Sequence, residues 1–140
     1  MEIANLLTAI HNKFANSNLA EDVGGRYYQD IAPLGTGTPY CVYSIVSSVM
    51  DKTFSEVYTN ALIQFDLFCS TAYASLMPTM YAHLKALFDE CGLSITGSTL
   101  VVMRETNLVT LAESLDEPLP DGSTGMLHWA VDYEAMTSLN

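Results

Sequence analysis

The sequence predicts an α+β domain: one mostly antiparallel β-sheet of about four to five strands, with two α-helices packed on one face. Two observations support this prediction. Apolar residues recur with a period of two in several segments, as in half-buried strands, and with a period of 3.6 in two others, as in amphipathic helices. The chain has 140 residues, the length of one domain, so we expect residues 1–140 to form a single unit.

The first part of the chain begins with a helix and continues into a loop. Apolar residues at helical spacing predict a helix over residues 2–16. Several glycines and prolines mark residues 17–38 as loop, with a short strand at 26–29. Val, Ile and Tyr are dense over residues 40–47, which favours a strand there.

A polar segment, residues 48–59, is expected to connect this strand to the next one. Apolar and polar residues alternate over residues 60–69, the pattern of a strand with one buried face. Phe65 lies in the apolar row of this strand. We therefore expect its side chain to face the helices.

The period then changes to 3.6, which predicts a second helix over residues 72–90 that Gly92 terminates. Pro78 lies within this segment. Either the helix begins near Ser75 and Pro78 occupies its first turn, or a longer helix kinks at Pro78. We favour the kink.

The last part of the chain is read as strand, loop and strand. Residues 99–111 are rich in Val and Thr, and residues 112–124 contain acids, prolines and a glycine, which predicts a loop. From Leu127 to Ala135 apolar and polar residues alternate clearly. Trp129 lies in the apolar row, so its side chain is also expected to face the helices.

The charge is strongly acidic, with 16 Asp and Glu against 5 Lys and Arg, for a formal net charge of −11. The basic residues occur singly and form no patch in the sequence. They are Lys13, Arg26, Lys52, Lys85 and Arg104. Because nucleic-acid binders need basic residues to displace counterions from phosphates, tight binding of DNA, RNA or an anionic membrane is not expected. The sequence also lacks an apolar run of about 20 residues that would span a membrane.

The chain contains cysteine and histidine residues, but their spacing is not that of a metal-binding or redox site. Cys41, Cys69 and Cys91 lack the spacing of a zinc or redox motif, and we interpret them as buried thiols of a protein made in a reducing compartment. The three histidines have no partner at metal-ligand spacing and are interpreted as surface or hydrogen-bonded residues. They are His11, His83 and His128.

Two further patterns allow a chemical interpretation. The Gly-Thr-Gly-Thr run at 35–38 lacks the lysine of a phosphate loop and is interpreted as a turn. Asp66, Asp132 and Glu134 could be imagined as paired catalytic carboxylates, but alternating polar residues on the exposed face of a half-buried strand explain them without catalysis, and we prefer this interpretation. We therefore assign no catalytic, cofactor-binding or metal-binding residue, and expect a protein that is not an enzyme.

The order of these segments resembles the tail-terminator, or tail-completion, family of long-tailed bacteriophages and related prophage particles. The resemblance covers nearly the whole chain and lies in the joint order of several short motifs. They are Gly25-Arg26-Tyr27-Tyr28, Ala32-Pro33, Pro39-Tyr40-Cys41-Val42-Tyr43, Gln64-Phe65-Asp66-Leu67-Phe68 and Met126-Leu127-His128-Trp129-Ala130-Val131-Asp132-Tyr133.

The resemblance implies a structural virion protein that forms a ring, usually a hexamer, on the last ring of the tail tube. Such a ring stops tube polymerisation and offers the surface that joins tail to head. The implied partners are other copies of the chain, the tail tube protein, head-tail connector or neck proteins and, as a further candidate, the tape measure protein. DNA would pass through the lumen without tight binding. The implied location is the tail-neck region of the virion, reached from the host cytoplasm during assembly.

Two alternatives stay open at this point: another neck protein of the adaptor or stopper type, and a small bacterial α+β enzyme or ligand-binding domain. For a ring, we expect the connections 48–59 and 112–124 to supply contacts or line the lumen, because loops on a rigid sheet often carry binding. An ordinary solvated surface explains the same charges. The residues concerned are Asp51, Lys52, Glu56, Asp116, Glu117 and Asp121.

Overall fold

The computed structural model describes residues 2–140 and contains, within them, three α-helices, one 3-10 turn and six strands. The helical elements are α1 (Ile3–Phe14), α2 (Asn18–Asp22), η1 (Thr71–Tyr73) and α3 (Leu76–Phe88). The strands are β1 (Tyr27–Gln29), β2 (Tyr40–Lys52), β3 (Val57–Ser70), β4 (Ser94–Ile95), β5 (Ser98–Ser114) and β6 (Gly125–Leu139). The order of elements expected from the sequence is confirmed, with α2 and β4 as additions.

All six strands form one sheet in the order β1-β2-β3-β6-β5-β4. β1 pairs with β2 in parallel, and every other neighbouring pair is antiparallel. The sheet is therefore mixed and six-stranded, where the sequence predicted about four to five mostly antiparallel strands. The missed strand, β4, has two residues, which is too short to display a period of two.

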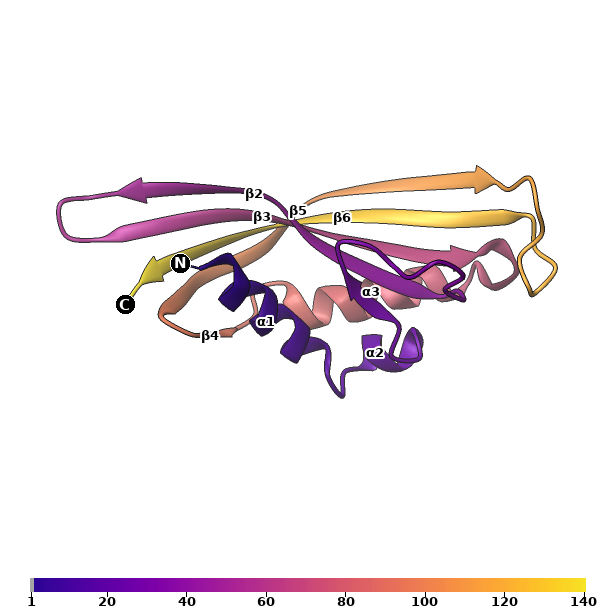
Figure 1. Cartoon of the computed structure of the whole chain (residues 1–140), viewed down its shortest axis with the longest axis horizontal. Coiled ribbons are helices and arrows are strands. Elements are labelled where there is room, and N and C mark those ends of the chain that lie inside the picture. Colours follow the sequence, from indigo (N-terminus) through magenta and orange to yellow (C-terminus); the bar gives the residue numbers. More distant parts are fainter. Residues whose placement is uncertain (1) are drawn as a thin grey trace.

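The helices lie on one side of the sheet and cover its central part (Figure 1). The core is the layer between them, where side chains of α1 and α3 meet the inward row of the long strands. Its largest fully buried side chains include Leu6, Ile10, Phe14, Phe65, Met80, Leu84, Phe88 and Tyr133. This confirms the expected packing of helices on one face, although α2 adds a third helix.

The two aromatic residues predicted to face the helices do so. Phe65 is fully buried, stacked on Phe88 of α3 at 4.6 Å and edge-on to Tyr133 at 5.5 Å between ring centroids. Trp129 is half-buried, with its ring centroid 5.8 Å from that of Tyr81 of α3. Trp129 therefore lies at the margin of the core rather than at its centre.

The short helix α2 lies where the sequence predicted only loop and strand. Ser17 caps it, since its hydroxyl accepts a hydrogen bond from Ala20 N at 3.0 Å, as N-cap serines commonly do. Leu19 is fully buried, and Asp22 contacts His83 of α3 through the imidazole Nδ1. Five residues hold too few turns for a helical period to be visible in the sequence.

Pro78 lies in the first turn of α3, which begins at Leu76, so the kinked longer helix favoured from the sequence is wrong. The nitrogen of a residue in the first turn has no intrahelical acceptor, and proline costs little there. Residues 71–73 form η1 instead of a continuous helix. The helix ends at Phe88, and Glu90, not Gly92, takes the left-handed conformation with φ 53°.

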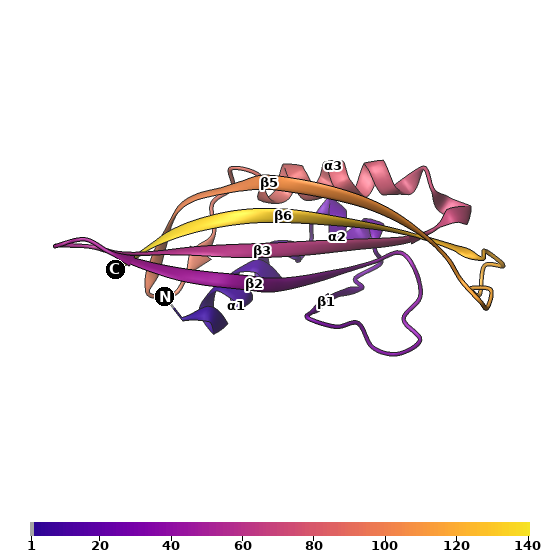
Figure 2. The same ribbon diagram turned by 90° about the horizontal axis from the view of Figure 1, so that it is seen from above.

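The strands extend well beyond the predicted segments. β2 continues to Lys52 and β3 begins at Val57, so most of the connection predicted at 48–59 is paired strand. β5 likewise continues to Ser114, and the loop between β5 and β6 is shorter than predicted. The polar residues in these extensions are accommodated because no helix covers either face there (Figure 2).

Candidate assembly surfaces

Two hairpins extend past the helical layer in opposite directions (Figure 1). We call residues 46–58, the outer part of the β2–β3 hairpin, the apolar arm. We call residues 109–128, the outer part of the β5–β6 hairpin with its loop, the acidic arm. Because such projecting segments make few contacts with the rest of their own chain, they are the parts best placed to contact another molecule.

The apolar arm ends in a tight turn closed by backbone and hydroxyl groups. Thr53 N donates to Glu56 O at 2.8 Å, and Glu56 N donates to the Thr53 hydroxyl at 3.0 Å. Phe54, between them, is fully exposed. Val49 and Met50 of β2 expose more than half of their surface. A run of exposed apolar side chains on a projecting hairpin marks an interaction surface.

The outer edge of the apolar arm is open. β1 pairs with β2 only at residues 41–43, and within the described chain no other strand pairs on that side of β2. The backbone groups of an edge strand are free to pair with another chain. On its other side, β2 is paired with β3 as far as Lys52 opposite Val57.

The acidic arm is held by hydrogen bonds to the end of β3. The Ser70 hydroxyl donates to Asp121, whose carboxylate also accepts from Ser123 N at 2.8 Å. These bonds lower the pKa of Asp121 below its ordinary value, the Ser70 bond contributing most. The hydroxyls of Thr71 and Ser123 are 2.7 Å apart. A Cβ at Gly125 would lie 2.6 Å from Thr71 Cγ2, so only glycine permits this approach.

The six residues singled out in the sequence fall into two sets, one in each arm. Asp51, Lys52 and Glu56 are exposed near the tip of the apolar arm, and Asp116 and Glu117 are exposed in the loop of the acidic arm. Asp121 is also exposed, but its carboxylate is engaged within the loop. One subunit does not bring the two sets together, because the arms lie at opposite ends of the sheet (Figure 1).

The helix-free face of the sheet carries an aromatic row across three strands. Tyr40 of β2 stacks on Phe68 of β3 at 4.7 Å, and Phe68 stacks on the His128 imidazole of β6 at 4.3 Å. His128 Nε2 lies 2.7 Å from Asp66 Oδ1. The sequence analysis did not anticipate that these residues form one contact group.

A hollow of about 270 Å3 lies over this aromatic row, walled on one side by the chain that follows β1. Its lining combines aromatic and aliphatic side chains with two acids. The lining residues are Asp30, Ile31, Ala32, Tyr40, Val42, Asp66, Phe68 and His128. Sequence analysis missed this hollow because its two sides are separated along the chain and meet only through strand pairing.

The carboxylates considered as a catalytic pair have distinct surroundings on this face. Asp66 is paired with His128, and Glu134 lies 3.7 Å from an Arg104 nitrogen. The pKa of Asp132 is raised, first by burial and then by the negative charge of Asp66. All three histidines have partners: Tyr43 for His11, Asp22 for His83 and Asp66 for His128. The alternating polar row thus forms separate pairs instead of one convergent group.

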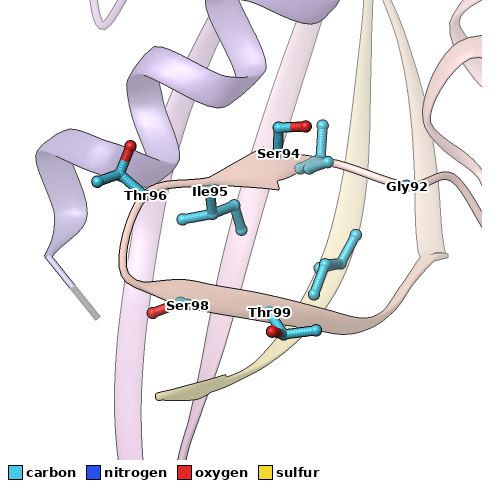
Figure 3. A pocket seen from close by; sticks show the side chains of 8 residues that line it. Gly92, Ser94, Ile95, Thr96, Ser98 and Thr99 are labelled. Atoms are coloured by element: carbon cyan, nitrogen blue, oxygen red, sulfur yellow. The ribbon is translucent and has the colours of Figure 1, made fainter. Parts of the chain in front are cut away.

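A second hollow, of about 360 Å3, lies along the β4–β5 hairpin (Figure 3). Its lining consists of glycine, leucine, isoleucine, serine and threonine residues. Side chains of this kind can hold a small neutral group by contacts and hydroxyl hydrogen bonds, but none of them titrates near neutral pH. Within residues 2–140, no three His, Cys, Asp or Glu side chains are grouped to hold a metal ion. No helix in that range is long and apolar enough to cross a membrane.

The fold is shared with solved structures. No protein-family model and no curated protein sequence matches the chain. A chain in the virion of a native gene transfer agent (GTA) particle superimposes with a TM-score of 0.71 at 14% identity, over 95% of this chain and 94% of that one. A second solved protein, known by a sequence identifier alone, has a TM-score of 0.56 at 12% identity, with 96% of each chain covered. At these identities the likeness establishes a common fold.

Proposed function

We propose that this chain is a structural, non-catalytic virion protein: a ring-forming tail terminator that caps the tail tube, stops its polymerisation and presents the surface that joins tail to head. The observation that carries the proposal is the likeness in fold, over nearly the full length of both chains, to a chain of a gene transfer agent virion. The motifs that resemble the tail-terminator family supply the specific role.

The arrangement of the arms suits a ring. Two different surfaces at opposite ends of one sheet favour a heterologous contact, in which one surface of a subunit meets the other surface of its neighbour. Such contacts close into a ring when the rotation between subunits closes. One side of the ring would then bind the end of the tube, and the other would block further addition and meet a connector protein.

The acidity suits a conduit for DNA. With a net charge of −11, the surface offers phosphates few positive partners, so DNA would slide past without being held.

 The ring is expected to hold six copies and to contact the tail tube protein on one side. Head-tail connector or neck proteins would contact the other side, in the tail-neck region of the virion.

The mass of the protein in solution, measured alone and with its tail tube protein, tests the proposal. We expect rings in negative-stain images, either free or at tube ends, and shorter tubes when the protein is added to polymerising tube protein. A protein that stays monomeric, does not bind tube ends and leaves tube length unchanged would contradict the proposal. Rings that bind a head-side connector and ignore tube ends would instead identify an adaptor or stopper.

A further inference from the structure

The tip of the apolar arm presents a single aromatic side chain to solvent. Phe54 is fully exposed, and the turn that carries it is closed by the hydrogen bonds between Thr53 and Glu56. Lys52, one of only five basic residues in the chain, precedes this turn and is also exposed. An aromatic side chain that projects into solvent is the type of residue that anchors protein interfaces.

The hollow over the Tyr40–Phe68–His128 row has an aromatic and acidic lining, which complements the aromatic ring and positive charge at the tip of the apolar arm. Its floor is aromatic, Ile31 and Ala32 form an apolar wall, and its acids are Asp30 and Asp66. Asp66 is paired with His128, whereas Asp30 is exposed at the rim. With a volume of about 270 Å3 the hollow can admit one aromatic ring, since a cavity of about 150 Å3 holds benzene.

We propose that Phe54 of one subunit occupies the hollow of a second copy of this chain, with Lys52 beside Asp30. The inference rests on the proposed function, because it requires the chain to assemble with itself. Tyr40 and Phe68 lie at the end of their strands opposite the turn that carries Phe54. The contact is therefore head-to-tail, and each subunit can give one Phe54 and receive another. Repetition of this contact builds a closed ring or an open filament.

Charge complementarity favours a second copy as the occupant. Two subunits of net charge −11 repel each other, so a self-contact is most favourable where a basic residue of one meets acids of the other. The apolar arm carries the acids Asp51 and Glu56 and one basic residue, Lys52. The hollow carries only acids and a histidine as titratable groups besides Tyr40, so Lys52 is the charged group of the arm that it attracts. The pair also orients the arm, since it fixes which side of Phe54 faces the rim.

Disulfide crosslinking between two variants, each with one introduced cysteine, tests the contact directly. Ser55→Cys, beside Phe54 in the exposed turn, and Ile31→Cys are prepared separately, so that Phe54 stays in place. Each also carries Cys91→Ser, because Cys91 is the free cysteine that is not buried. Two cysteines bridge only when their Cα atoms come within about 7 Å. We expect a crosslinked dimer when the two variants are mixed and oxidised, and no dimer from either variant alone. Val101→Cys, at another exposed apolar position, replaces Ile31→Cys in the control mixture and should give no dimer.

Sedimentation measurements provide the second readout. Phe54→Ala should weaken self-association about 30-fold, as loss of a central anchor does. Ala32→Trp, which fills the hollow, should weaken it comparably, and both variants should keep the melting temperature of the parent protein. Val101→Ala should leave association unchanged. Unchanged association of Phe54→Ala, or no dimer in the mixture of cysteine variants, would overturn the inference.

The outcomes separate this inference from the proposed function. Rings that form without the 31–55 crosslink overturn the inference and leave the proposed function intact. Loss of binding to another virion protein in Phe54→Ala, with self-association unchanged, assigns the arm to that protein and also overturns the inference. A parent protein that stays monomeric and has no effect on tail tubes contradicts both.

Discussion

Phe54 and Phe65 are the same amino acid in two regions of opposite physical character. Phe65 lies in the helix-covered centre, fully buried between Phe88 and Tyr133. Phe54 lies at the tip of an arm and is fully exposed. Burial of the first side chain stabilises the subunit, whereas exposure of the second is a cost that a binding partner would remove. The centre thus holds the chain folded, and the arms are free for contacts with other molecules.

The two arms differ from each other as well. The apolar arm has a short turn, an open strand edge and apolar side chains in solvent. The acidic arm has a longer loop that is tied to β3 and η1 through Asp121 and Ser123. It contains four acidic and no basic residues. One end of the molecule is therefore suited to dry contact with a protein surface, and the other to a hydrated, negatively charged surface.

The largest effect on stability is expected at the centre. Phe65→Ala removes a fully buried ring and should lower the free energy of unfolding by about 3–5 kcal/mol. Phe54→Ala, the matched change in the apolar arm, should alter it by no more than about 0.5 kcal/mol. Urea unfolding of the two variants measures both values. A comparable loss in Phe54→Ala would mean that the arm packs against its own subunit.

A smaller loss is expected at the margin of the core. Trp129 is half-buried against Tyr81, so Trp129→Ala should lower the free energy of unfolding by about 2 kcal/mol. Asp132→Ala, on the opposite face of the same strand, should cost much less. Thermal melts in which Asp132→Ala is as damaging as Trp129→Ala would contradict the placement of Trp129 on the helix-facing side of β6 and Asp132 on the opposite side.

Asp132→Asn should stabilise the subunit slightly at pH 7. Burial, followed by the charge of Asp66, raises the pKa of Asp132 in the folded protein, so its ionised form opposes folding. The opposing contribution is present above the folded pKa and disappears as the pH falls to the ordinary pKa of an aspartate. The difference in melting temperature between Asp132→Asn and the parent should therefore shrink on acidification. A difference that grew on acidification would contradict this sign.

Asp121→Ala should loosen the loop of the acidic arm with little effect on the centre. The change leaves the Ser70 hydroxyl and Ser123 N without their acceptor. Because hydrogen bonds lower the pKa of Asp121, the parent loop should also loosen as the pH falls through that lowered value. Faster amide exchange confined to residues 115–124 is the expected readout. Asp116→Ala, an exposed acid of the same loop, serves as the control.

The smallest effect on folding is expected from reversing the free acids of the acidic arm. Asp116→Lys with Glu117→Lys should leave the melting temperature unchanged. If these acids line the lumen of the proposed ring, the assembled variant should bind DNA, and this binding should weaken steeply as the salt concentration rises. Glu2→Lys with Glu21→Lys, at exposed sites on the helical side, is the matched control. Assembled Asp116→Lys, Glu117→Lys protein that ignores DNA would assign the two acids to the outer surface.

The sequence alone determined the elements that have one buried face. A residue next to the core must be apolar whatever its distant neighbours are. The spacing of apolar residues around Phe65 and Trp129, and in α1 and α3, therefore shows which side chains are buried. The outward position of the six charged residues could be anticipated for the same reason. The alternation weakens in the arms, because no layer covers them and neither face of a strand there is required to be apolar.

Only the tertiary structure decided what these elements do together. Because β2 and β3 pair as far as their turn, β2 continues past residue 47 and β3 begins before residue 60. The connection predicted from the sequence is therefore a paired arm. The same pairing brought Tyr40, Phe68 and His128 into one row, and the turn after β1 placed Asp30 at its rim. Contacts between residues so far apart in the chain leave no local pattern. Phe54 was overlooked because a single apolar residue in a polar segment acquires meaning only when its position at the tip is known.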